Sequence, residues 1–179
     1  MTGPSGVGKG TLIRGLLKQV PDFELSVSAT TRPPRADEVN GRDYHFLSPE
    51  EFDRRVGAGE FVEHAEYAGN RYGTLRSELA RPARGIVLEI DVQGARQVRE
   101  SLPDAHHVFI EPPAGQSLET LQARLARRAS DSPEQVERRL AAARDELAAA
   151  SEWKYRIVND ELERALAELA ALAATMCGP

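Results

Sequence analysis

The stretch GPSGVGKGT at residues 3–11 decides the fold, because it matches the pattern G-x-x-x-x-G-K at Gly3, Gly8 and Lys9. Glycines let the chain curl so that successive backbone N–H groups point inward at phosphate oxygens, and Lys9 and the positive end of the following helix favour the same anion. The alternative is a glycine-rich turn that only caps a helix, but a lysine at this spacing favours phosphate binding. The predicted phosphate-binding residues are Gly3, Pro4, Ser5, Gly6, Val7, Gly8, Lys9, Gly10 and Thr11.

Gly10 departs from the pattern, which has Ser or Thr after the lysine. A hydroxyl there would bind Mg²⁺ beside the phosphates. Thr11 is adjacent but is turned by about 100° around the helix, so it does not simply replace that hydroxyl. The GKGT form is similar to the loop of adenylate kinases, which work with glycine at this place. The departure weakens a metal assignment and leaves the phosphate assignment intact.

Only Met1 and Thr2 precede the loop. Loops of this kind normally follow a buried strand of a parallel sheet. We therefore expect the natural chain to begin earlier, by about one strand length or somewhat more, on the order of 5–20 residues. Without that strand, its neighbours in the sheet would lose hydrogen-bonding partners.

The remaining pattern predicts an α/β fold with a parallel sheet, because strands alternate with helices at both ends of the chain. The nearly continuous apolar run from residue 85 to Asp91 predicts a strand buried on both faces, and 106–113 predicts a second one. Residues 23–31 predict a single half-buried strand. Helices are predicted after the phosphate loop, from the N-cap Ser48, near 75–80, and through 117–129, 132–150 and 161–174.

Composition narrows the function classes. The 179 residues are 41% apolar and 28% charged, which suits one folded domain. The net charge of −5 excludes a bulk nucleic-acid surface. No apolar run approaches the ~20 residues of a membrane span, and no signal peptide is present. Cys177 has no internal partner for a disulfide, which suits a reducing compartment. We therefore expect a soluble, cytoplasmic protein. The acidic charge balance favours small-molecule ligands over a polyanion.

A second anion site is predicted at Arg32 and Arg35, which flank two prolines, with Tyr44 downstream. Proline stiffens the loop, so both guanidinium groups are presented with little entropy to lose. Arginine forks with a tyrosine hydroxyl suit a terminal phosphate monoester. Alone the pattern would more often be a solvated basic loop. The phosphate loop favours the acceptor site, because a phosphoryl donor needs an acceptor.

Five segments together resemble the guanylate kinases, in the same order and over almost the whole chain. These are SATTRPPRADEVNGRDYHF (28–46), EFVEHAEYAGNRYGT (60–74), IVLEIDVQG (86–94), ARLARRASDSPEQVERRLAAARDEL (123–147) and YRIVND (155–160). The resemblance implies a P-loop kinase fold that transfers the γ-phosphoryl group of ATP to GMP with Mg²⁺, giving ADP and GDP. It implies a core of residues 1–31, 83–117 and 151–179, an inserted GMP-binding subdomain at 32–82 and a helical lid at 118–150.

The resemblance also implies how GMP is held. Glu63 would accept hydrogen bonds from the guanine N1–H and 2-amino group, with Ser28 and Thr74 on the O6 side. Adenine offers no such donors, and leaving a buried carboxylate unpaired costs on the order of 1–3 kcal/mol. Taken alone, Glu63 would be an exposed strand glutamate. Asp91 would lie near the metal and the acceptor phosphate, and it also suits a helix N-cap. The GMP phosphate would be bound by Arg32, Arg35, Tyr44 and Tyr72.

Arg124, Arg127 and Arg128 share one helix face, and Arg138 and Arg139 lie on the next helix. Alone, this pattern is typical of a solvated, ion-paired face. The resemblance implies lid arginines that neutralise charge on the transferring phosphoryl group. The implied catalytic residues are Lys9, Arg127, Arg128, Arg139 and Asp91; Arg124, Asn159 and Asp160 would lie on the adenine side, and Thr11 and Asp91 near Mg²⁺, in part through water.

Two alternatives remain open from the sequence. One is a kinase for another nucleoside monophosphate, suggested by GKGT. The other is a non-catalytic guanylate-kinase-like domain that binds phosphorylated peptides. Glu63, Ser28 and Thr74 argue against the first. Lys9 and the lid arginines, which such silent domains typically lack, argue against the second.

Overall fold

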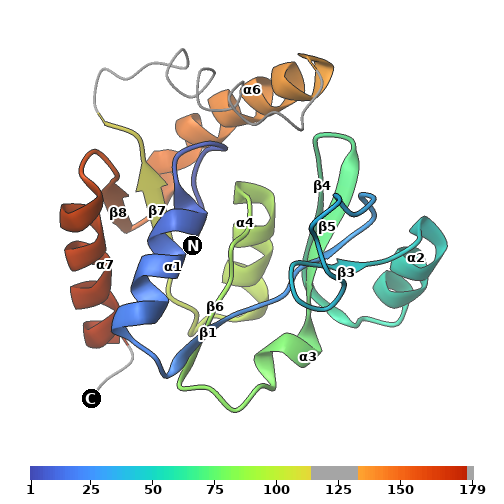
Figure 1. Ribbon diagram of the computed structural model, residues 1–179, viewed down its shortest axis with the longest axis horizontal. Helices are drawn as coiled ribbons and strands as arrows, with labels where there is room; N and C mark the ends of the chain where they lie inside the picture. Colours follow the sequence, from blue (N-terminus) through green and yellow to red (C-terminus); the bar gives the residue numbers. More distant parts are fainter. Residues whose placement is uncertain (114–132, 177–179) are drawn as a thin grey trace.

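The computed structural model describes residues 1–113 and 133–176. Figure 1 shows a core with α1, α7 and the parallel strands, and a smaller lobe of strands and short helices beside it. The core contains α1 (Lys9–Gln19), β1 (Phe23–Leu25), β6 (Gly85–Val87), α4 (Val92–Ser101), β7 (Val108–Glu111), the 3₁₀ helix η1 (Ala149–Glu152), β8 (Tyr155–Val158) and α7 (Leu162–Met176). Helix α6 (Pro133–Ala148) packs on the core through Ala143 and extends toward the smaller lobe (Figure 1). The smaller lobe contains β2 (Ala29–Thr30), β3 (His45–Phe46), α2 (Pro49–Gly57), β4 (Phe61–Tyr67), β5 (Asn70–Leu75) and α3 (Arg76–Leu79).

The core strands run parallel, as the sequence predicts. β1 pairs with β6 and β7 pairs with β8. Met1 and Thr2 join the two pairs, because Met1 donates to Leu88 O and accepts from Ile90 N on one side. On the other side Thr2 donates to Val108 O and accepts from Ile110 N. Two residues therefore hold the start of the phosphate loop between β6 and β7.

The prediction that residues 85–91 form a strand buried on both faces was wrong. Only Gly85–Val87 is strand, and its residues are half-buried. The reason lies beside it: an apolar cavity of about 270 Å³ opens next to Met1, between β6 and β7. The residues of β6 line this cavity, so neighbouring side chains cover them only in part. By contrast, β7 is buried at Val108, Phe109 and Ile110, as the apolar run predicts.

The prediction of one strand at residues 23–31 was also wrong. β1 belongs to the core, whereas β2 lies between β3 and β5 in the sheet of the smaller lobe. The carboxylate of Glu78 accepts the Val27 N–H at 2.8 Å, which satisfies the backbone where the chain leaves the core. Alternation along the sequence cannot reveal such a bend, because each half keeps its own half-buried face. The bend places Ser28 where the two parts meet.

The sheet of the smaller lobe has the order β3-β2-β5-β4, with β4 and β5 forming a hairpin. Residues 70–74 were not predicted as a strand, and the hairpin pairing makes them one. α2 begins as predicted, with the Ser48 hydroxyl accepting the Glu51 N–H at 3.1 Å. Phe52 of α2 packs on Phe61 of β4 with ring centroids 4.6 Å apart, which fixes the helix to the sheet.

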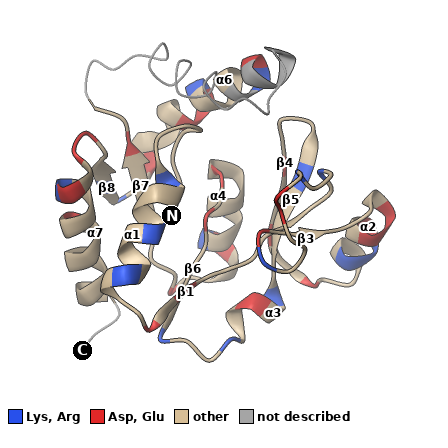
Figure 2. Cartoon of the chain, viewed as in Figure 1, with Lys and Arg blue, Asp and Glu red and all other residues tan. Residues whose placement is uncertain are grey.

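α7 packs on α1 through Ala165 and Leu169, in a cluster that also holds Leu12 and Leu16. None of the helices in the described ranges is long and apolar enough to cross a membrane. Figure 2 shows charged residues of both signs spread over the helices and strands of this part of the chain.

Candidate active site

The phosphate loop has the backbone shape that its glycines predict. Gly3, Gly6 and Gly8 all adopt positive φ angles, of 140°, 83° and 102°. Positive φ is strained for side-chain-bearing residues, so this curl requires glycine. α1 follows directly at Lys9, with no side-chain cap on its first turn. The positive dipole end of α1 therefore lies at the loop, where it favours an anion.

Asn159, at the end of β8, holds the loop from behind. Its side-chain amide donates to Val7 O at 2.7 Å, and Val7 itself is fully buried. A Cβ on Gly8 would lie 2.5 Å from the same amide nitrogen, so this approach also needs glycine there. Asp160 points elsewhere and pairs with Arg164 in an exposed i, i+4 contact. Asn159 thus acts on the loop, whereas Asp160 lies outside it.

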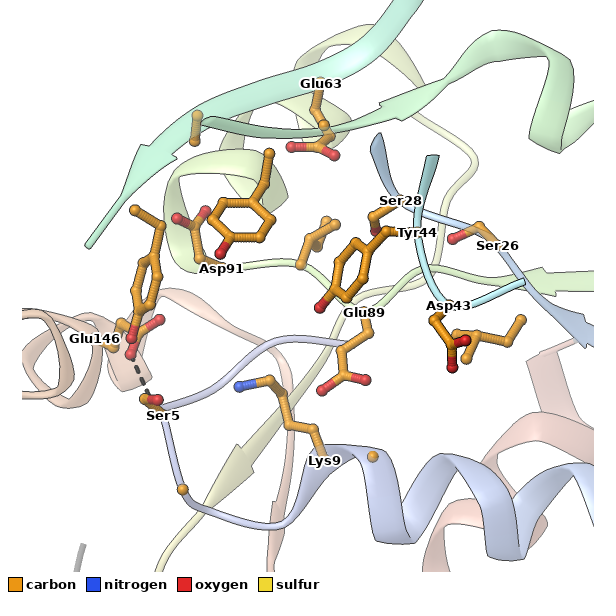
Figure 3. A pocket seen from close by; sticks show the side chains of 18 of the residues that line it. Ser5, Lys9, Ser26, Ser28, Asp43, Tyr44, Glu63, Glu89, Asp91 and Glu146 are labelled. Atoms are coloured by element: carbon orange, nitrogen blue, oxygen red, sulfur yellow. Dashed lines mark hydrogen bonds between the residues drawn. The ribbon is translucent and has the colours of Figure 1, made fainter. Parts of the chain in front are cut away.

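Lys9 is folded back over the loop. Its ammonium donates to Gly3 O at 2.6 Å and to Pro4 O at 3.3 Å. This arrangement keeps the positive charge directly above the amides of the loop. Opposite it, the Glu146 carboxylate of α6 accepts the Ser5 N–H at 3.1 Å, the contact drawn as a dashed line in Figure 3.

Loop and smaller lobe face each other across one cavity of about 420 Å³. Figure 3 shows Lys9 of α1, Glu63 of β4, and Glu89 and Asp91 of the β6–α4 connection pointing into it. Most of the predicted site residues whose side chains line this cavity end in oxygen or nitrogen atoms, so the cavity suits a polar ligand. Of the predicted site residues, its lining includes Ser5, Gly6, Gly8, Lys9, Gly10, Thr11, Ser28, Tyr44, Glu63, Tyr72 and Asp91.

Glu63 lies at the far wall of this cavity, on β4, and is only 4% exposed. The Thr74 hydroxyl donates to its carboxylate at 2.7 Å. Burial raises the pKa of Glu63 to about 7, and the negative charge of Asp91 acts in the same direction. A buried carboxylate with so few donors is poised to accept hydrogen bonds from a ligand.

Asp91 is the N-cap of α4, as the sequence predicts, and it also lines the cavity. Its Oδ1 accepts the Gly94 N–H at 2.8 Å at the start of α4. Burial raises the pKa of Asp91. Gly94 in turn lies against Glu63, because a Cβ there would be 2.3 Å from Glu63 Oε2. The start of helix α4 therefore contacts the carboxylates of both Asp91 and Glu63, and it leaves no room for a side chain at Gly94.

Arg32 is held in place by Glu38, a residue that the sequence did not single out. Arg32 Nη2 lies 2.7 Å from Glu38 Oε1, and the Arg32 guanidinium lies over the Tyr44 ring at 5.2 Å from its centroid. Glu38 also accepts the Arg35 N–H at 2.8 Å. Burial raises the pKa of the Tyr44 hydroxyl, so it stays protonated and able to donate at neutral pH. Tyr72 lies beside Tyr44, with ring centroids 6.1 Å apart.

Glu89 is a second residue of the site that the sequence did not single out. A Cβ built on Gly10 would lie 3.6 Å from Glu89 Oε2, so an acidic oxygen lies close to where the usual hydroxyl would project. The Thr11 hydroxyl accepts a hydrogen bond from Arg14 on the exposed side of α1. Within residues 1–113 and 133–176, no cluster of three or more Asp, Glu, His or Cys side chains could hold a metal alone. A metal here would need oxygens from the ligand as well.

Several predicted residues lie off the cavity wall or outside the described residues. Gly3, Pro4 and Val7 belong to the phosphate loop but are buried and do not line the cavity. Thr74 lies behind Glu63 and donates a hydrogen bond to its carboxylate. Arg124, Arg127 and Arg128 lie outside the described residues, and Arg139 belongs to α6 with a side chain that is not described. On α6, the Arg138 guanidinium lies against Gly69 at the tip of the β4–β5 hairpin. No sequence signal singled out Glu146, one glutamate among many on a helix.

Comparison with known proteins assigns the family. The family model described as Guanylate kinase matches residues 1–175. The chain is 54% identical over 172 residues to the guanylate kinase of Thermosynechococcus vestitus, covering 94% of this chain and 88% of that one. It is 51% identical to the guanylate kinase of Rubrobacter xylanophilus, with the same coverage. The chain belongs to the guanylate kinase family.

The fold agrees with this assignment. A crystal structure of guanylate kinase from Anaplasma phagocytophilum superposes with a TM-score of 0.78 at 31% identity, covering 99% of this chain and 85% of that one. The predicted resemblance and the P-loop kinase fold class are therefore confirmed.

Proposed function

We propose that this chain transfers the γ-phosphoryl group of ATP to GMP, giving ADP and GDP. The observation that carries the proposal is that a phosphate loop and a buried base-accepting carboxylate, Glu63, open onto the same cavity. One site suits the phosphates of the donor and the other suits the acceptor base. A phosphate oxygen of GMP attacks the γ-phosphorus and ADP leaves, so no general base is needed.

The acceptor phosphate is proposed to bind where Arg32, Arg35, Tyr44 and Tyr72 gather. Glu38 prearranges Arg32 by a two-oxygen contact, at 2.7 and 2.9 Å from Nη2. The neutral hydroxyl of Tyr44 and the fixed arginine fork supply donors that match a phosphate monoester. Prearranging these groups lowers the entropy that binding has to remove.

Guanine selection is proposed to rest on Glu63, with Ser28 and Thr74. A guanine N1–H and 2-amino group would give the buried carboxylate two donors in addition to the Thr74 hydroxyl. Adenine, cytosine and uracil do not present this pair of adjacent donors, so their binding would leave the carboxylate buried and poorly paired. The hydrogen bonds that Glu63 can accept therefore favour GMP over other nucleoside monophosphates, the alternative substrates that the GKGT sequence left open.

Donor binding is proposed to use the loop amides and Lys9, with Arg127, Arg128 and Arg139 completing the charge neutralisation. Phosphoryl transfer depends mainly on positioning and on stabilising spread negative charge. Lys9 already lies over the loop, which is the place for such a cation. Arg124, Asn159 and Asp160 stay proposed for the adenine side, with Asn159 also holding the loop.

Mg²⁺ is the proposed cofactor, bound together with ATP. The residues present fit it, because Glu89 and Asp91 offer the oxygen ligands that this ion prefers, directly or through water. Thr11 was predicted as a ligand, and its hydroxyl is engaged by Arg14. When bound, the ion would neutralise charge on the phosphates. Glu89 and Asp91 would hold it on the side of the cavity that faces Lys9.

Replacing Lys9 by Met tests the enzyme against the phosphopeptide-binding alternative. Removing the charge from the loop should lower kcat for ADP release by at least about 10³-fold, because transition-state charge is left unbalanced. Lys18→Met is the matched control, since Lys18 is exposed in the last turn of α1. It should keep wild-type turnover. Undiminished turnover in Lys9→Met, or no turnover in the wild-type chain, would contradict the proposed function.

A further inference from the structure

Glu146 is a buried anion at the phosphate loop. It is 6% exposed, and its Oε2 accepts the Ser5 N–H at 3.1 Å. No ion pair of Glu146 is found in the part of the chain that the structure describes. Among the described residues, the cation that acts on it is Lys9, whose ammonium donates to Gly3 O and Pro4 O instead. A carboxylate in this position is expensive to keep charged.

The groups that face Glu146 come from three elements. Lys9 of α1 favours its charged form, whereas Asp91 at the start of α4 and the exposed Asp145 of α6 itself disfavour it. Burial is the largest influence and raises the pKa of Glu146 to about 7. The carboxyl group is therefore close to half-protonated at neutral pH.

A bound phosphate chain would compete with this carboxylate. Ser5 belongs to the loop whose amides are proposed to receive the phosphates, and Glu146 occupies one of those amides. Two anions brought together in a buried site cannot both stay fully charged without a large cost. The cost is removed if the carboxylate takes up a proton, since a protonated carboxyl can donate to a phosphate oxygen.

We propose that Glu146 is a positioning residue that holds the Ser5 amide of the phosphate loop and takes up a proton when a triphosphate binds. The inference rests on the proposed function, because it requires the loop to bind phosphate. It predicts that the affinity of the loop for polyphosphate falls as pH rises. That dependence belongs to the protein and is separate from protonation of the ligand.

Calorimetric titration with inorganic tripolyphosphate at pH 8, in two buffers of different ionisation enthalpy, measures the proton uptake of the wild-type chain. With a pKa of about 7, Glu146 is about nine-tenths ionised at pH 8, so uptake should approach one proton. Glu146→Gln keeps an oxygen for the Ser5 N–H and removes the charge. It should show no uptake and bind about tenfold more tightly than wild type at pH 8, with equal affinity at pH 6.

Asp145→Asn is the matched control, because it removes the same charge one residue away on the exposed side of α6. It should keep the proton uptake and change the affinity less than about twofold. Equal uptake and affinity in wild type and Glu146→Gln would overturn the proposal while leaving the phosphate loop intact. Absence of tripolyphosphate binding in both proteins would overturn the loop assignment, and with it the proposed function. If Glu146→Gln fails to fold, the wild-type uptake alone decides, and a value near zero contradicts the proposal.

Discussion

At the residue scale, the site depends on carboxylates that the fold has removed from water. Glu63 and Glu146 both lie against the central cavity, and burial raises the pKa of each to about 7. Nothing in their sequence neighbourhoods separates them from the exposed glutamates of the same elements. Glu63 could be predicted only through the family resemblance, and Glu146 could not be predicted at all. Burial of a single side chain is a tertiary property that local patterns do not carry.

Replacing Glu63 by Gln should stabilise the ligand-free chain at alkaline pH. Because the folded-state pKa lies above the unfolded value, the stabilising contribution of the protonated form is complete below about pH 4.5 and is lost as pH rises through 7. Gln removes that loss, so its free energy of unfolding at pH 8 should exceed the wild-type value by up to ~3 kcal/mol. Near pH 4.5 the two should be equal. Urea denaturation at both pH values measures the difference.

The same variant should lose the stabilisation that GMP gives to the wild-type chain, because the amide presents a donor where guanine also has one. Glu66→Gln is the control, since Glu66 lies on the same strand and is exposed. It should leave both the pH dependence and the GMP response unchanged. A Glu63→Gln protein that still melts at a higher temperature with GMP would contradict the assigned role of Glu63.

At the element scale, the helices α6 and α7 and the buried strand β7 followed from the sequence, whereas the full predicted strand from residue 85, the bend after β1 and the pairing of β5 did not. α2 begins at the predicted cap, Ser48, because that signal is local. The split between β1 and β2 depends on Glu78 reaching the Val27 amide from 51 residues away. β5 depends on pairing with β4 in the hairpin. Such contacts are long-range, so alternation in the sequence cannot reveal them.

Helix α4 and strand β4 meet at Gly94, and this contact should matter for the acceptor only. A methyl group at Gly94 would lie 2.3 Å from Glu63 Oε2 and push the carboxylate out of its place. Gly94→Ala should therefore weaken GMP binding by at least about tenfold, as expected for losing a hydrogen bond to a charged group. Tripolyphosphate binding should be unchanged. Isothermal titration with each ligand measures both.

Gly57→Ala provides the comparison for this variant. Gly57 is the last residue of α2, and nothing lies within 4 Å of an added Cβ there. The change should leave GMP affinity at the wild-type value and raise stability slightly, since alanine favours helix over glycine by up to about 1 kcal/mol. Unaltered GMP affinity in Gly94→Ala would show that Glu63 is not held against α4 in the way described.

At the scale of the whole molecule, residues of the phosphate loop and of the smaller lobe line one cavity. The proposed donor and acceptor sites would share it. The boundaries of the core, the GMP-binding subdomain and the lid stay predictions, as does a cytoplasmic location. The two residues before the phosphate loop do take a place between β6 and β7, through hydrogen bonds to both.

A compound that joins adenosine and guanosine through five phosphates should exploit the shared cavity. Once one end is bound, the other binds at a high effective concentration, so its affinity should exceed that of ATP or GMP by at least about 10²-fold. The matched compound with two adenosines should gain much less, because its second base lacks the donors for Glu63. Equal affinity of the two compounds, measured by titration calorimetry, would contradict a single cavity with a guanine-selective wall.

The central claim is that the cavity pairs a phosphate-donor loop with a guanine-selective acceptor site. Its most direct test is the rate of ADP release from ATP with GMP, AMP, CMP and UMP in turn as acceptor. We expect kcat/KM for GMP to exceed that for each of the others by at least about 10³-fold, because only guanine satisfies the buried Glu63 carboxylate. Equal rates with the four acceptors, or a faster rate with any of the other three, would contradict the account.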